Sequence, residues 1–105
     1  MGALRNLDGR AMASRWRRRR MCVIVAEGAA PAALREICAT GAFVETSIRP
    51  TVGSRVELRH PDAGAIGARV TAVTEAGLAL AFSFGDESVA FALAAVAADM
   101  SRPGA

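Results

Sequence analysis

The sequence is poor in the residues that build metal centres, large aromatic cores and membrane spans. It has no lysine or tyrosine, one histidine, one tryptophan and two cysteines, and aromatic residues make up 5% of the chain. One histidine and two cysteines without a Cys-x-x-Cys pair do not supply the ligands of a zinc site. No apolar run reaches the roughly 20 residues of a membrane helix, and no hydrophobic segment follows the N-terminal arginines as in a signal peptide. We therefore expect a cytoplasmic protein without a metal, a cofactor or a membrane partner.

The length and composition indicate one small domain. Of 105 residues, 52% are hydrophobic and 22% are charged, which is typical of a single soluble domain. We predict this domain over residues 15–100, with a disordered leader over residues 1–14 and a short tail over residues 101–105. Cys22 and Cys38 are expected to be reduced and largely buried, with a disulfide or a functional Cys38 as the alternatives.

The positive charge is concentrated at the N-terminus. Residues 1–20 contain seven arginines and one acid, whereas residues 21–105 contain six arginines and nine acids, so +6 and −3 give the net charge of +3. A protein that binds nucleic acid over its whole surface would be basic throughout. A local basic segment instead fits a compact anionic ligand, a short phosphate contact or an acidic partner, and we expect no specific nucleic-acid binding.

Six short β-type runs separated by turn residues predict an all-β fold. They cover residues 21–27, 33–37, 42–46, 53–60, 65–73 and 78–84. In the fourth run Val56 and Leu58 alternate with charged residues, which is the pattern of a half-buried strand. Tight turns are expected at residues 60–64 and 74–77. Six strands at this spacing predict a six-stranded antiparallel barrel over residues 21–85.

Two details of these strands follow from individual residues. Gly28 and Pro31 are expected to end the first strand, because proline removes a hydrogen-bond donor from a β-ladder. The last strand is expected to turn four alternating apolar residues inward: Leu78, Leu80, Phe82 and Phe84.

The C-terminal segment changes from the strand period to a helical one. After Gly85, Asp86 can cap a helix, and one apolar stripe then follows at spacings of four, three and four: Val89, Leu93, Val96 and Met100. We predict a helix over residues 87–100 that packs this stripe against the barrel. A helix that binds a partner would have the same pattern.

The most unusual local feature is an arginine run that leads into the first strand. Arg15, Arg17, Arg18, Arg19 and Arg20 surround a single tryptophan. Guanidinium groups bind phosphate with two hydrogen bonds, stack on purines and recognise the edge of guanine. The run over residues 15–20 is therefore a candidate anion-binding arm, with a solvated basic flank as the alternative.

A second candidate site lies at the end of the second predicted strand. Glu36 and Cys38 are two positions apart and so project from the same face of a strand. Gly41 permits a tight turn that exposes backbone amides to a ligand. Taken alone, this is also the sequence of an ordinary junction between a strand and a turn.

Together these stretches resemble the PilZ domain family. That family has an R-x-x-x-R motif before its first strand, matched here by Arg15 and Arg19, and a D/N-x-S-x-x-G motif, whose place is taken by residues 36–41. Val52-Gly53-Ser54 and the run at 77–84 also match, so the resemblance spans residues 15–100. It implies a six-stranded antiparallel barrel with a C-terminal helix. It further implies a cytoplasmic bacterial receptor for cyclic di-GMP that acts on a downstream protein effector.

The resemblance also implies roles for the arginine arm. Arg15 and Arg19 would clamp the phosphates of cyclic di-GMP and cover its guanines. Arg18 and Arg20 would assist them.

The second motif departs from the family at two positions. Gly41 is the motif glycine, but Glu36 replaces Asp or Asn, and Cys38 replaces Ser. Glu36 keeps a carboxylate that can accept from guanine, whereas a thiol is a weak hydrogen-bonding group. The alternative is therefore a degenerate PilZ domain that binds no nucleotide and acts as a protein-interaction adaptor.

The few reactive side chains do not suggest an enzyme. His60 precedes a proline in a predicted turn and is expected to be exposed, and Cys38 has no evident base partner in the sequence. We expect no catalytic activity.

Overall fold

Six antiparallel strands close into a barrel in the computed structural model, which describes residues 20–100. The elements are β1 (Arg20–Val25), β2 (Ala29–Cys38), β3 (Gly41–Glu45), β4 (Arg55–His60), β5 (Gly64–Val73), β6 (Leu78–Ala81) and α2 (Asp86–Met100). The strand order is β1-β2-β3-β6-β5-β4, and pairing of β1 with β4 closes the barrel. The predicted all-β barrel with a C-terminal helix is confirmed. The predicted leader over 1–14 and the tail over 101–105 lie outside the described residues.

Alternating side chains fill the barrel. Val56 and Leu58 of β4 are buried as predicted, and Ile24 of β1 and Val44 of β3 are fully buried opposite them. Burial of each aliphatic side chain stabilises the fold by about 1.5–3 kcal/mol. Because these side chains are small, the core is thin.

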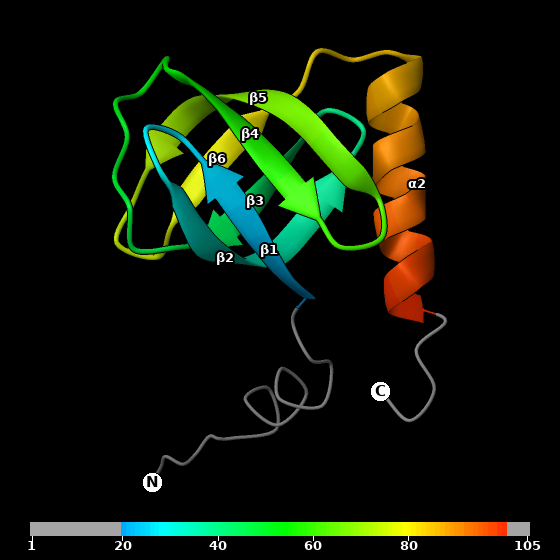
Figure 1. The fold of residues 1–105 in the computed structure, drawn as a ribbon. Coiled ribbons are helices and arrows are strands. Elements are labelled where there is room, and N and C mark those ends of the chain that lie inside the picture. The colour runs from blue at the N-terminus through cyan, green and yellow to red at the C-terminus, as the bar shows by residue number, and fades with distance from the viewer. Residues whose placement is uncertain (1–19, 101–105) are drawn as a thin grey trace, which may run out of the picture.

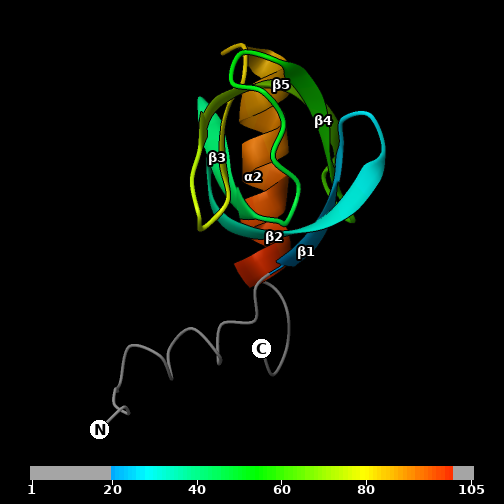
Figure 2. The ribbon, with the colours of Figure 1, turned by 90° about the vertical axis from the view of Figure 1, so that its left-hand side faces the viewer.

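Helix α2 covers one end of the barrel, as Figure 1 shows from the side. In Figure 2, which looks into the barrel, α2 crosses its far end. The buried face of α2 consists of Ser88, Phe91, Ala92 and Ala95. The rings of Phe91 and Phe82 meet edge to face with centroids 5.9 Å apart, and the two alanines let the helix approach closely.

The predicted packing face of this helix is wrong. Val89 of the predicted stripe is half-buried, but Leu93, Val96 and Met100 are 66%, 40% and 79% exposed, so most of the stripe points away from the barrel. The barrel end instead accepts one aromatic ring and small side chains. The helix begins at Asp86, one residue earlier than predicted. At its start the Ser88 hydroxyl both accepts from the Gly85 amide and donates to the Gly85 carbonyl.

The boundary predicted from Pro31 is also wrong, because Pro31 lies inside β2 opposite Val23 of β1. β2 pairs with β3 only from Ala33 onward, so on that side Pro31 has no neighbouring strand that needs its missing N–H group. The Thr46 hydroxyl donates to the Pro31 carbonyl there at 2.9 Å. The first hairpin therefore turns at residues 26–28, and β2 is longer than the predicted strand over 33–37.

The last strand is shorter than predicted. β6 ends at Ala81, and Phe82 is the last of its alternating apolar residues to be buried. Phe84 lies in the connection to α2 and is 71% exposed, so its predicted inward orientation is wrong.

Both predicted hairpin turns are confirmed. His60 pairs with Gly64 across the first turn, where Gly64 has a φ of 96° that favours glycine. Thr74 and Gly77 exchange two backbone hydrogen bonds across the second. Among residues 20–100, no helix is both long and apolar enough to cross a membrane.

Candidate functional site

The end of the barrel beneath α2 brings together three segments that are distant in the sequence. They are the start of β1, the turn between β2 and β3, and the turn between β4 and β5. Arg20 pairs with Leu34 in an antiparallel register, so the chain enters β1 at the end of the barrel where β2 continues to Cys38. Arg15, Arg18 and Arg19 lie outside the described residues.

Glu36 and Cys38 are both exposed at the end of β2. Glu36 pairs with Phe43 and Cys38 with Gly41, after a β-bulge that follows Leu34. No hydrogen bond or ion pair of the Glu36 carboxylate is found with the described residues, so its oxygens are open to a ligand. The predicted pair of polar side chains is therefore presented to solvent.

The two cysteine thiols differ in environment. Both are free, but Cys22 is buried and Cys38 is exposed, so the prediction that both are buried is wrong for Cys38. Burial raises the pKa of Cys22 to about 11, against the opposing effect of the nearby Arg20 guanidinium. The Cys38 thiol lies 3.1 Å from the Thr40 hydroxyl, and hydrogen bonds from Thr40 and Gly41 lower the pKa of Cys38. Cys38 is thus the more readily ionised thiol.

Gly41 has a structural reason to be glycine. A Cβ atom at this position would overlap the backbone carbonyl oxygen of Leu80 in β6. The absence of a side chain lets β3 approach β6 closely, and this requirement holds with or without a ligand.

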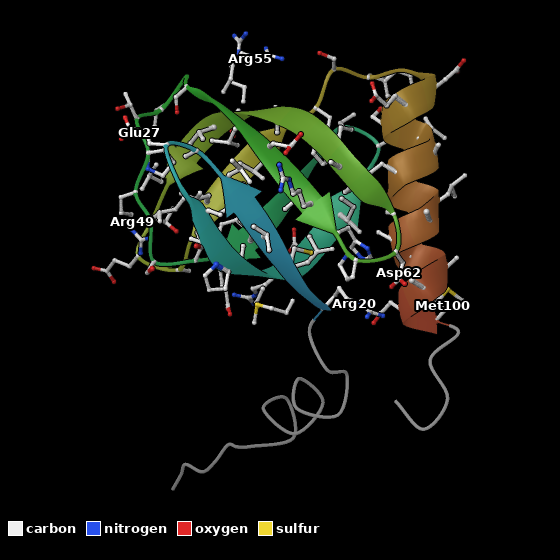
Figure 3. All side chains as sticks on the ribbon, in the orientation of Figure 1. Arg20, Glu27, Arg49, Arg55, Asp62 and Met100 are labelled. Carbon is white, nitrogen blue, oxygen red and sulfur yellow. The ribbon has the colours of Figure 1, made fainter. Side chains whose placement is uncertain are left out.

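Arg20 faces the opposite side of the sheet from Glu36 and Cys38. It shares the inward side of β1 with Cys22, its side chain is only 14% exposed, and its Nη1 atom lies 3.5 Å from Oδ2 of Asp62. For the buried Nε and Nη2 atoms, no hydrogen-bond partner is found among residues 20–100. Figure 3 shows Arg20 and Asp62 close to the C-terminal end of α2. Arg20 therefore belongs to a cluster under the helix, and the structure does not bring it together with the other predicted site residues.

His60 belongs to the same cluster, and its predicted exposure is wrong because it is only 4% exposed. As the last residue of β4, His60 continues the inward alternation of that strand. Its ring meets the Phe91 ring edge to face, with the ring centroids 6.2 Å apart. Its Nδ1 atom accepts hydrogen bonds from the backbone amides of Asp62 and Ala63 at 3.0 and 3.1 Å. The proton of the neutral ring is therefore on Nε2, which has no hydrogen-bond partner in the part of the chain that the structure describes.

The surroundings of His60 favour its neutral form. Burial and, second, the Arg20 guanidinium lower its pKa, while Asp62 and Asp99 oppose that shift. Protonation would also place a hydrogen on Nδ1, where it would meet two amide donors. The covered end of the barrel therefore buries a neutral imidazole.

The opposite end of the barrel has a cavity that the sequence did not reveal. It has a volume of about 540 Å³ and lies between the β1–β2 turn and the β3–β4 loop, with Glu27, Ser54 and Arg55 in its wall. Figure 3 shows Glu27, Arg49 and Arg55 on the side of the barrel away from α2. Arg49 is tied to backbone carbonyls of Thr46 and Ile48 and therefore acts as a structural clamp. In the sequence, only the glycines and prolines of these two segments indicated loops. They did not indicate that the two loops pack around a cavity.

Comparisons of the chain with protein-family models, with curated proteins and with solved structures gave no match. Over the described range, no three His, Cys, Asp or Glu side chains are grouped so that they could hold a metal ion. The candidate site therefore rests on the geometry of the barrel and on the sequence motifs.

Proposed function

We propose that the protein is a cytoplasmic cyclic di-GMP receptor that passes its ligand state to a downstream protein effector. Arg15 and Arg19 clamp the phosphates and guanines against the barrel, with Arg18 assisting. The Glu36 carboxylate accepts from a guanine edge. This assigns the chain a binding role rather than a catalytic one.

The observation that carries this proposal is the register of β1 and β2. Because Arg20 lies opposite Leu34, an arginine arm that precedes Arg20 starts at the barrel end that presents the exposed Glu36 and Cys38 side chains. A ligand with two phosphates and two purines can then contact the arm and the barrel at once. Because the Arg20 side chain points inward and lies beside Asp62, we assign it an anchoring role at the start of β1 in place of the assisting role that the resemblance implies.

The two departures from the family motif are expected to weaken binding rather than abolish it. A longer carboxylate at Glu36 and a thiol at Cys38 each put about one ligand hydrogen bond at risk, or about 0.5–1.5 kcal/mol apiece. Each loss corresponds to about a 2- to 13-fold decrease in affinity. The arginine contacts with phosphate are charge-assisted and therefore stronger.

Calorimetric titration with cyclic di-GMP near physiological salt tests the proposal, with GTP as the control ligand. Saturable binding that is lost in the Arg15→Ala/Arg19→Ala double variant is the expected result. Deletion of residues 1–19, which keeps all of β1, is expected to have the same effect. Absence of heat, together with an unchanged melting temperature at about 100 μM ligand, would contradict the proposal.

A second candidate function is a protein-interaction adaptor, and the outer face of α2 favours it. Leu93, Val96 and Met100 are exposed at the spacing of a heptad seam. The helix also carries three acids and no basic residue. An apolar stripe with acidic ends fits a partner that has an apolar surface and a basic rim.

A photoreactive group placed at position 93 tests the adaptor function. We expect it to trap one effector in stoichiometric amount, with or without cyclic di-GMP, and we expect Val96→Asp to prevent trapping. Trapping that is unchanged by Val96→Asp would count against this face as the docking surface.

A further inference from the structure

Two arginines lie directly opposite each other on the outer surface of the barrel. Arg55 of β4 pairs with Arg69 of β5, and both side chains are exposed. Like charges at directly opposed positions of an antiparallel pair repel and destabilise the sheet. An arrangement of this kind is relieved when an anion lies between the two guanidinium groups.

No carboxylate of the described residues neutralises this pair. The nearest acid along the outer face of β4 is Glu57, and it already accepts a hydrogen bond from Nε of Arg59 at 2.6 Å. Arg59 is therefore a paired arginine on the same face of the same strand, whereas no ion pair is found for Arg55 or Arg69 within residues 20–100. This contrast provides an internal control for any anion-binding experiment.

Arg55 and Arg69 both line a hollow on this surface. It has a volume of about 230 Å³, and its wall includes Arg55, Arg69, Gly67 and Ser83. Gly67 contributes no side chain, and a Cβ atom there would be 3.8 Å from Nη2 of Arg55. The Arg55 guanidinium therefore extends over the sheet toward β5, and the residues that line the hollow include two arginines and Ser83.

We propose that this hollow binds the phosphate group of a small phosphorylated molecule. Arg55 and Arg69 each donate to the phosphate oxygens, and the Ser83 hydroxyl supplies a further donor. The hollow, of about 230 Å³, has room for a phosphate group. This proposal does not depend on cyclic di-GMP binding at the arginine arm.

The hollow is nevertheless close to the β2–β3 turn. Ala81 of β6 pairs with Gly41 on one side and with Arg69 on the other. Two strand spacings, or about 10 Å, therefore separate Arg69 from Gly41. The experiment must consequently separate a free phosphate ester from a phosphate of cyclic di-GMP.

Amide chemical-shift titration by NMR tests the proposal on the full chain, with methyl phosphate as the probe and ionic strength held constant. We expect saturable shifts at Gly67 and Ser83, with a dissociation constant on the order of millimolar. Arg55→Gln and Arg69→Gln are each expected to weaken binding by about tenfold. Arg59→Gln is expected to leave it unchanged. Both glutamine variants should keep the wild-type melting temperature or raise it, because they remove a like-charge contact.

Three outcomes would overturn this assignment. One is a lack of saturable shifts up to about 50 mM methyl phosphate. Another is equal weakening by Arg59→Gln, which would indicate a general surface potential. The third is stronger binding to a DNA duplex with a steep salt dependence, which would indicate a nucleic-acid surface. A parallel cyclic di-GMP titration of Arg69→Gln and Arg15→Ala/Arg19→Ala identifies which site fails, because each variant removes only one of the two.

Discussion

The two ends of the barrel differ in how far they are closed to water. The end beneath α2 is closed, and it buries the polar side chains of Arg20 and His60 together with the Cys22 thiol. At the opposite end no helix of residues 20–100 covers the barrel, and an open cavity of about 540 Å³ lies beside Glu27 and Arg55. Removal from water shifts the pKa of buried groups, so the closed end is expected to couple stability to pH through His60.

The glycines differ in how closely neighbouring backbone approaches them, and not by the end of the barrel on which they lie. A Cβ atom on Gly41 at the closed end or on Gly77 at the open end would overlap the backbone of a neighbouring strand, whereas a Cβ atom on Gly28 would meet nothing within 4 Å. The arginines do differ between the ends: Arg20 has buried nitrogens for which no partner is found within residues 20–100, while the exposed Arg49 donates to backbone carbonyls. Substitution of Gly41 is therefore expected to cost more than substitution of Gly28.

The largest effect is expected from the buried face of α2. Phe91→Ala removes the ring that contacts His60 and Phe82, and we expect a loss of about 3–5 kcal/mol in the free energy of unfolding. Leu93→Ala, on the exposed face, should change it by less than about 0.5 kcal/mol. Urea denaturation of both variants measures the difference, and equal losses would show that the docking face of α2 has been assigned incorrectly.

A smaller but clear effect is expected from glycine substitutions at the two ends. Gly41→Ala should destabilise the protein by about 1–3 kcal/mol because it forces β3 away from β6. Gly28→Ala should be within about 0.5 kcal/mol of wild type. Thermal unfolding compares them. A stable Gly41→Ala protein that fails only in ligand binding would mean that this glycine serves the ligand and not the barrel.

The closed end should also make stability depend on pH. The pKa of folded His60 lies below its ordinary value of 6.5, so below that pH the unfolded chain binds more protons. The contribution of His60 to the free energy of unfolding is therefore highest above pH 6.5. It decreases as the pH drops below that value, by at most about 1.4 kcal/mol per pH unit. Urea titrations from pH 7.5 to 5.5 measure this slope. His60→Gln should lose it, and an equal slope in that variant would assign the effect to other groups.

The smallest structural effect is expected from the two thiols, which differ mainly in reactivity. With a pKa of about 11, the Cys22 thiol is only about 0.1% ionised at pH 8. Cys38 is exposed and has a lowered pKa. Mass spectrometry after brief treatment with iodoacetamide should therefore find the label on Cys38 and not on Cys22 until urea is added. Labelling of both thiols in the native protein would show that the closed end opens readily.

The barrel was predictable because alternation along each strand identifies its buried face. The same alternation predicts that His60 is buried, because it continues the inward series of Val56 and Leu58. The neighbouring Pro61 instead favoured an exposed turn. In α2 the sequence offered two faces, and the more hydrophobic one with Leu93 was the wrong choice. The helix instead packs through one phenylalanine and three small residues.

The candidate sites were only partly predictable. The arginine run and residues 36–41 were visible as motifs, and strand register relates the start of β1 to the end of β2. The opposition of Arg55 and Arg69 was not visible, because it depends on register across β4 and β5. The inward orientation of Arg20 also depends on strand geometry, which the arginine run does not reveal.

An amide chemical-shift map of the full chain during titration with cyclic di-GMP tests most directly where the nucleotide binds. The largest shifts are expected at the closed end, over residues 36–41 and the start of β1, and small shifts are expected at Gly28 and Thr51 beside the open cavity. Shifts centred on the open cavity, or no shifts at saturating ligand, would contradict the proposal that the closed end of the barrel receives the nucleotide.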